Sequence, residues 1–200
     1  MVGSIINKNI MDHSNFEKKE NKENFSILVL GGSQGAEIFG KIVPLVVKMI
    51  KDKGYNLEVN HQCIENQKNS IIDYYKKNNI KNYVFQFEKN ILNLILSSDL
   101  VITRCGASAT AELTYALTPF IAVPLPDSID NHQYLNAKFY EDKGCCWLLE
   151  QSNFNKENLY NLLIEIINNK KILQTKSENM KKNYTNNAYS VIETKIREII

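Results

Sequence analysis

The fold of this chain is decided by the stretch Asp99-Leu-Val-Ile-Thr-Arg-Cys-Gly-Ala-Ser-Ala-Thr-Ala-Glu112. Its beginning, Asp99 to Ile102, reads as a short buried strand, and Arg104-Cys-Gly-Ala is a tight turn of small residues. Ser108 then starts a helix. A strand followed by a turn and a helix is the repeating unit of a parallel sheet covered by helices.

The turn after this strand is a candidate anion site. It aims free backbone N–H groups and the positive end of a helix dipole at one point, which favours a phosphate. Glu112 follows Ser108 by one helical turn and lies over the same face of the helix. A carboxylate there would repel a phosphate and could bind the paired hydroxyls of a ribose. Alternatively, Glu112 only complements the helix N-terminus, and the stretch alone leaves both interpretations open.

Length and composition are those of an ordinary globular protein, with 200 residues, 44% of them hydrophobic and 23% charged. The net charge of +2 comes from mixed Lys and Glu, so nothing favours a nucleic-acid partner. The four cysteines lack metal-ligand spacing, so we expect free thiols and no metal site. No apolar run reaches the ~18 residues of a membrane-spanning helix, and no signal peptide is recognisable. A cytoplasmic location is predicted.

The chain is predicted to consist of an arm and one domain. Residues 1–24 end in a solvated charge run and are expected to form a linker or arm, and residues 25–200 form the domain. The predicted strands are Phe25–Leu30, one marked by Leu57 and Val59, Tyr83–Phe87, Asp99–Ile102, Phe120–Pro124 and Cys146–Leu149. The fold class is therefore α/β, a Rossmann-like open parallel sheet of about six strands with helices on both faces.

The helices are predicted between and after these strands. The first carries an apolar stripe from Phe39 to Ile50, with Pro44 expected to kink it or weaken one hydrogen bond and Gly54 expected to end it. The others are expected near residues 67–78, at Ile91–Ser97, at Asn131–Lys143 with Gly144 closing it, and as two or three amphipathic helices at the end of the chain.

Two further strand ends carry unusual residues, and in this architecture all three such ends lie on one rim. The first is Gly31-Gly-Ser-Gln-Gly-Ala36, where glycines let a ligand approach the backbone and Ser33 adds a hydroxyl. The spacing is not G-x-G-x-x-G, and Asn60 and His61 stand where an NAD site has an acidic residue. An NAD-dependent dehydrogenase is therefore disfavoured, and a tight turn without a ligand remains the alternative.

The third strand end is Asp130-Asn-His-Gln-Tyr-Leu-Asn-Ala137. Asp130 is predicted to be the N-cap of the following helix. Asn131, His132 and Gln133 then crowd amides and an imidazole into one turn, and such groups hydrogen-bond sugar hydroxyls. We favour a binding role for them over a place on an ordinary surface.

Taken together, Gly31–Ala36, Arg104–Glu112 and Asp130–Ala137 resemble the donor-domain signatures of the MurG family. These are the bacterial UDP-N-acetylglucosamine–N-acetylmuramyl-(pentapeptide) pyrophosphoryl-undecaprenol N-acetylglucosamine transferases. The resemblance runs in order from about Val2 to the C-terminus, and it implies one lobe of a two-lobed, GT-B-type protein. It implies no cofactor.

The resemblance also implies a role for each loop. The glycine-rich loop and the helix N-terminus would hold the pyrophosphate, Glu112 the ribose, the backbone near Phe87 the uracil, and His132 with Gln133 the sugar. The implied UDP-N-acetylglucosamine site consists of Gly32, Ser33, Gln34, Gly35, Phe87, Glu88, Gly106, Ala107, Ser108, Ala109, Glu112, His132 and Gln133. Two positions depart from the family pattern, because Asn7 replaces an expected arginine near the uracil and Glu88 replaces an apolar residue.

In the family, the C4 hydroxyl of a lipid-linked muramyl-pentapeptide attacks C1 of the sugar in an inverting displacement, which converts lipid I to lipid II in peptidoglycan synthesis. The acceptor loops, the catalytic-base candidate and the membrane-facing patch belong to the family's N-terminal half, which this chain lacks. No catalytic residue is therefore assigned here. The complete protein is expected at the cytoplasmic face of the inner membrane, which this chain contacts only indirectly.

Three functional hypotheses follow. The first is the donor-binding half of such an enzyme, which a second chain could complete as in the eukaryotic dolichol-linked transferase. The second is a non-catalytic module that senses a nucleotide sugar. The third is a sugar-nucleotide epimerase of the same general fold, whose acidic catalytic residues we cannot assign.

Overall fold

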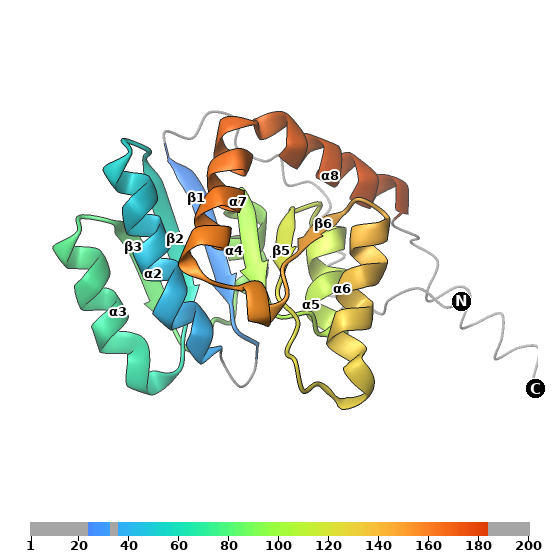
Figure 1. The fold of residues 1–200 in the computed structure, drawn as a ribbon, viewed down its shortest axis with the longest axis horizontal. Coiled ribbons are helices and arrows are strands. Elements are labelled where there is room, and N and C mark those ends of the chain that lie inside the picture. Colours follow the sequence, from blue (N-terminus) through green and yellow to red (C-terminus); the bar gives the residue numbers. More distant parts are fainter. Residues whose placement is uncertain (1–23, 33–35, 184–200) are drawn as a thin grey trace, which may run out of the picture.

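The computed structural model describes residues 24–32 and 36–183, and Figure 1 shows their fold. The predicted arm, Asn7 and the loop residues Ser33, Gln34 and Gly35 lie outside the described residues. The strands form one parallel six-stranded sheet in the order β3-β2-β1-β4-β5-β6. They are β1 Phe25–Leu30, β2 Leu57–Gln62, β3 Lys81–Phe85, β4 Leu100–Thr103, β5 Phe120–Ala122 and β6 Cys146–Leu148.

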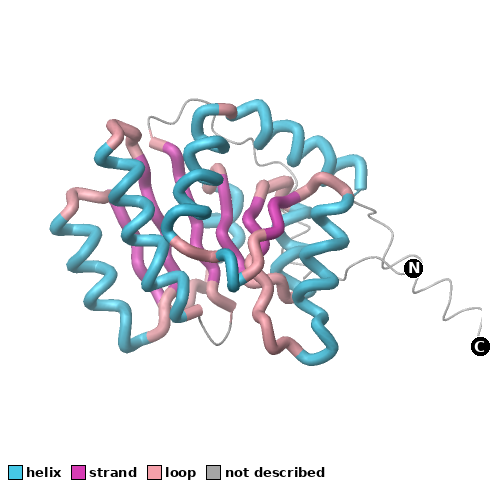
Figure 2. Tube along the Cα trace, in the orientation of Figure 1, coloured by secondary structure: helices cyan, strands magenta, loops and turns pink. Residues whose placement is uncertain are grey.

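The helices cover both faces of this sheet, and Figure 2 shows the strands lying between them. They are α2 Glu37–Asp52, α3 Glu65–Lys77, α4 Ile91–Ser97, α5 Ala107–Tyr115, α6 His132–Asp142, α7 Lys156–Asn168 and α8 Lys170–Asn183. Two short 3₁₀ turns, η1 Ile129–Asn131 and η2 Gln151–Asn153, precede α6 and α7. The predicted α/β class, with its parallel sheet and two helical faces, is confirmed.

Successive side chains of a strand point to opposite faces of the sheet and pack into two core layers, one on each face. Ile27 and Val29 of β1 belong to the first core layer, which includes residues of α2, α3 and α7. Leu28 and Leu30 belong to the second core layer, which includes residues of α4, α5, α6 and α8. Because β1 is buried on both faces, its sequence is a continuous apolar run.

Several strand boundaries differ from the prediction. β3 begins at Lys81 and ends at Phe85, because it pairs residue by residue with β2 from Glu58 to Gln62, and an ion pair joins Lys81 to Glu58. β5 ends at Ala122, although the Val123 amide still donates to the Thr103 carbonyl at 2.8 Å. The next residue, Pro124, has no N–H to continue the ladder.

The helix boundaries agree more closely with the prediction than the strand boundaries do. α4 has the predicted bounds, and α2 is one continuous helix across Pro44, which leaves the Gly40 carbonyl without its usual intrahelical donor. The predicted end of α6 at Gly144 is confirmed, since Gly144 follows the helix with a left-handed φ of 67°. Within the described ranges no helix is both long enough and apolar enough to cross a bilayer.

Candidate functional site

The carboxyl ends of β1, β4 and β5 lie side by side, which places the first residues of the three predicted loops on one rim. Leu30 pairs with Thr103, and Thr103 pairs with Ala122. Just beyond these pairs, the Arg104 amide donates to the Leu30 carbonyl at 3.2 Å. Gly32 has φ +78°, and a Cβ there would lie 3.9 Å from the Arg104 Cβ, so its backbone conformation rather than space favours glycine.

The helix after β4 begins earlier than predicted. Gly106 is the N-cap of α5, not Ser108, because the chain already turns there and the Thr110 amide donates to the Gly106 carbonyl at 3.1 Å. No side chain caps this end. The first three helical amides, at Ala107, Ser108 and Ala109, therefore have no intrahelical acceptor, and none donates to another described residue. Ala107 and Ser108 are exposed. This end of α5 can present its amides and positive dipole to an anion.

Glu112 lies one helical turn beyond Ser108 on the same face of α5. Its side chain is half-buried, and burial raises the pKa of the carboxyl. No hydrogen bond or ion pair joins this carboxylate to another of the described residues. A carboxylate complements the helix dipole best within the first turn of a helix. Because α5 begins at Ala107, Glu112 lies beyond that first turn. Its proposed contact with ribose remains a prediction.

The loop after β5 reaches α6 through two left-handed residues. The predicted N-cap at Asp130 is wrong, because Asn131 occupies that position and neither residue caps the helix through its side chain. Asp130 has φ 51° and Asn131 has φ 56°, values that Asp and Asn tolerate better than most residues. The two left-handed residues break the backbone between η1 and α6, so a local cap signal could not fix where α6 begins.

Gln133 joins two of the loops. Its Oε1 accepts hydrogen bonds from the Cys105 amide at 3.2 Å and from the Leu125 amide at 3.1 Å. The Asn136 Nδ2 adds a bond to the Cys105 carbonyl at 3.0 Å. The amide oxygen of Gln133 is therefore occupied by hydrogen bonds from the two loops. Only its NH₂ group is left to donate to a sugar hydroxyl.

His132 is exposed on the same helical turn. Its Nδ1 lies 2.7 Å from the Ile129 carbonyl oxygen. Because a carbonyl only accepts hydrogen bonds, the neutral ring carries its proton on Nδ1 and leaves Nε2 as an acceptor. The ring can therefore accept a hydrogen bond from a sugar hydroxyl.

Phe87 and Glu88 follow β3, which is separated from β1 by β2. Phe87 is 77% exposed and lies in the loop beyond the strand. The Glu88 carboxylate accepts from the Asn90 amide and from the Tyr83 hydroxyl, both at 2.9 Å, and these two hydrogen bonds lower its pKa. The Glu88 side chain is thus bound to its own loop and to β3, which leaves backbone groups to contact a base.

Arg104 has a role that sequence reasoning missed. Its side chain is only 8% exposed, and burial lowers its pKa. The Nη1 atom donates to the Val123 and Pro124 carbonyls at 3.1 Å, and Nη2 donates to the Gln151 Oε1. The guanidinium lies over the Phe39 ring at 5.0 Å from its centroid. This buried cation, which has no carboxylate partner among the described residues, links the turn after β4 to the loop after β5, to η2 and to α2.

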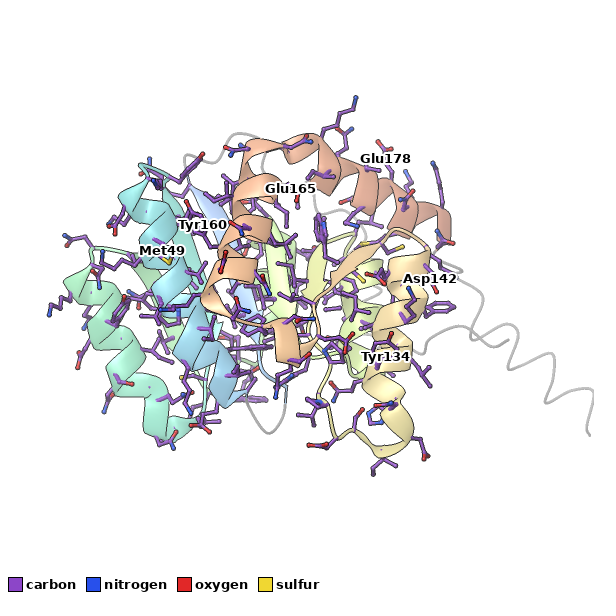
Figure 3. All side chains as sticks on the ribbon, viewed as in Figure 1. Met49, Tyr134, Asp142, Tyr160, Glu165 and Glu178 are labelled. Atoms are coloured by element: carbon purple, nitrogen blue, oxygen red, sulfur yellow. The ribbon has the colours of Figure 1, made fainter. Side chains whose placement is uncertain are left out.

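A pocket of about 330 Å³ lies beside these loops. Its walls come from the loop after β5, the first turn of α6 and the segment that includes η2. The lining residues are Pro124, Leu125, Pro126, Asn131, Tyr134, Glu150, Gln151 and Ser152. Figure 3 labels Tyr134 near the beginning of α6. Asn131 and Tyr134 belong to the Asp130–Ala137 motif, whereas no local motif marks residues 150–152.

Comparison with known proteins gives a consistent result. Residues 26–194 match the glycosyltransferase family 28 C-terminal domain. The UDP-N-acetylglucosamine–N-acetylmuramyl-(pentapeptide) pyrophosphoryl-undecaprenol N-acetylglucosamine transferase of Rickettsia bellii is 36% identical over 204 residues, which cover 100% of this chain and 57% of that protein. The enzyme of the same name from Pelagibacter ubique is 36% identical over 200 residues, which cover 100% and 55%.

A solved structure agrees with these relatives. The crystal structure of Acinetobacter baumannii MurG superposes with a TM-score of 0.82 at 26% sequence identity, and the match covers 92% of this chain and 55% of that one. The chain therefore spans a little more than half the length of the proteins it matches.

Proposed function

The chain belongs to the glycosyltransferase family 28 C-terminal domain family, and on this basis we propose that it binds UDP-N-acetylglucosamine as the donor half of a transferase. The complete enzyme would transfer N-acetylglucosamine to a lipid-linked muramyl-pentapeptide, converting lipid I to lipid II in peptidoglycan synthesis. It would work peripherally at the cytoplasmic face of the inner membrane, and a second lobe would hold the acceptor.

The observation that carries this proposal is the uncapped end of α5. Its amides at Ala107, Ser108 and Ala109 lie beyond β4, next to the strand end that leads into the glycine-rich loop. A diphosphate bound there would meet N–H donors and the positive end of the dipole. The same groups would stabilise the charge that develops on departing UDP.

The remaining groups fit the other parts of the donor. Glu112 would accept from the ribose hydroxyls, and the backbone at Phe87 and Glu88 would contact the uracil. The Nε2 of His132 would accept from a sugar hydroxyl, and the NH₂ of Gln133 would donate to one. The acceptor C4 hydroxyl would then attack C1 opposite the diphosphate, and its proton would pass to a base on the other lobe.

Calorimetric titration tests donor binding directly. The chain should bind UDP and UDP-N-acetylglucosamine, with the second ligand tighter because it adds contacts at α6. UDP-glucose and NAD serve as matched ligands, and NAD should not bind, because the loop after β2 offers no acidic ribose partner. Failure to bind UDP, or equal affinity for NAD, would refute the proposal.

A further inference from the structure

The pocket beside α6 has a defined position relative to the proposed donor site. Gln133 and Asn136 point toward the turn after β4, where both bond Cys105. Asn131 and Tyr134, on another side of the same helix, line the pocket. The first turn of α6 therefore stands between the diphosphate turn and the pocket.

The strand order extends this relation. Along the rim, β4 is followed by β5 and then by β6. The diphosphate would lie at the end of β4 and the sugar at the loop after β5, while the pocket lies between that loop and the residues after β6. An inverting displacement requires the incoming oxygen on the side of C1 opposite the leaving group. An acceptor bound in the pocket would lie on the side of the sugar away from the diphosphate.

The chemistry of the walls fits a sugar that carries peptide groups. Pro124, Pro126 and Tyr134 offer carbon surfaces, and Asn131 and Gln151 offer amides that donate and accept. Ser152 adds a hydroxyl. The exposed Glu150 carboxylate only accepts hydrogen bonds and would repel a phosphate, so this is not a second diphosphate site.

Two lining residues of the pocket are held in place before any ligand binds. Arg104 donates to the Pro124 carbonyl and to the Gln151 side chain, two of the lining residues. Because its guanidinium is buried and also lies over Phe39, these lining groups are fixed to the sheet. A pocket ordered in this way loses less conformational entropy when a ligand enters.

We propose that this pocket receives the muramyl-peptide end of the acceptor, so that the donor lobe itself contacts the second substrate. The sugar ring would pack on Tyr134 and the proline wall, and the first peptide groups would bond Asn131, Glu150 and Gln151. The acceptor's pyrophosphate would point away from Glu150, toward the other lobe. This inference rests on the proposed function.

The test uses the 200-residue chain, first saturated with UDP and then titrated with soluble N-acetylmuramyl-pentapeptide, while side-chain amide signals are followed by NMR. The Asn131 and Gln151 signals should shift and saturate. Tyr134→Ala and Glu150→Gln should each weaken this binding roughly 5- to 10-fold, as expected for losing one contact, and leave UDP affinity unchanged. Glu157→Gln, at an exposed site on α7 outside the pocket, is the matched control and should bind normally.

The possible outcomes separate the two proposals. If UDP does not bind, the proposed function fails and this inference fails with it. If UDP binds but the muramyl-peptide produces no saturable shift, or the pocket variants bind it normally, only the acceptor pocket is refuted. N-acetylglucosamine is the comparison ligand, and equal shifts from it at equal concentration would assign the pocket to the donor sugar and overturn the inference.

Discussion

At the scale of single residues, Glu112 is a carboxylate that the fold half-buries without giving it a partner among the described residues. Burial raises its pKa, so the folded protein binds this proton more tightly than the unfolded chain does. The contribution of Glu112 to stability is therefore lost as the pH rises above the ordinary range of a glutamate. Because burying the ionised Glu112 carboxylate destabilises the fold, we infer that this side chain serves ligand binding.

We therefore expect Glu112→Gln and Glu112→Ala to weaken UDP binding by about 1.5–3 kcal/mol, the range for a hydrogen bond to a charged group. Glu112→Gln should leave the free energy of unfolding at pH 7 equal or slightly higher, since it removes a desolvated charge. Calorimetry measures the affinity and urea denaturation the stability. Parallel losses of both quantities would mean that Glu112 is structural.

His132 and Gln133 are neighbours with different attachments, which allows a matched pair of variants. His132→Ala removes an exposed ring and should weaken UDP-N-acetylglucosamine while sparing UDP and thermal stability. Gln133→Ala leaves the Cys105 and Leu125 amides without their acceptor, which should cost about 1–3 kcal/mol of stability and weaken both ligands. If Gln133→Ala melts at the wild-type temperature, the hydrogen bonds from Cys105 and Leu125 to Gln133 do not contribute to stability.

At the scale of elements, the packing of α3 on β2 encloses a neutral histidine. His61 is fully buried, its Nδ1 lies 2.9 Å from the Tyr75 hydroxyl, and its Nε2 has no hydrogen-bond partner within the described part of the chain. Burial lowers its pKa to about 3. Cys63 and Tyr75, the titratable neighbours, have pKa values raised by burial and remain neutral in acid.

Because the pKa of His61 is lowered, the unfolded chain binds its proton first, and stability is lost as the pH falls below about 6.5 toward 3. Between pH 7 and pH 4.5 this group alone should cost about 2–3 kcal/mol. Urea denaturation at the two pH values measures the loss. His61→Gln should lose less stability over this interval than wild type. Identical pH profiles for His61→Gln and wild type would contradict this account.

The elements also show what a sequence can and cannot predict. β1 and α4 were located correctly, because a continuous apolar run stopped by Gly31-Gly32 and a short amphipathic segment are local signals. The start of α5 was placed too late, because Ser108 is a favoured N-cap residue while the turn is set by distant bonds to Leu30 and Asn136.

In the candidate site, too, local sequence signals could be predicted and contacts between distant residues could not. Its loops were found because glycines, small residues and clustered amides are visible along the chain. The contact between Arg104 and Gln151 was not, because the two residues are 47 positions apart and Gln151 stands in no distinctive motif. The pocket was missed for the same reason, since its walls come from three segments that only the sheet brings together.

At the scale of the whole molecule, the chain should bind the donor without transferring the sugar. It would be incubated with UDP-N-acetylglucosamine and a lipid-pyrophosphoryl-muramyl acceptor, with and without an acceptor-lobe protein. UDP and disaccharide should form only when the second lobe is added, because that lobe would supply the base for the acceptor hydroxyl's proton and would bind the lipid-pyrophosphate end of the acceptor. Disaccharide made by the chain alone, above the level of a Glu112→Ala control, would overturn this prediction.

The central position of β1 has a consequence for how the protein unfolds. Since β1 supplies alternate side chains to both core layers, neither layer can lose it and stay packed, so the two halves of the sheet should melt together. Trp147, the single tryptophan, lies in β6 and packs against the first core layer. β6 is the edge strand opposite β3. Its fluorescence and the far-ultraviolet circular dichroism should therefore report one cooperative transition with the same midpoint. A separate early change in Trp147 would show that the β5–β6 edge unfolds on its own.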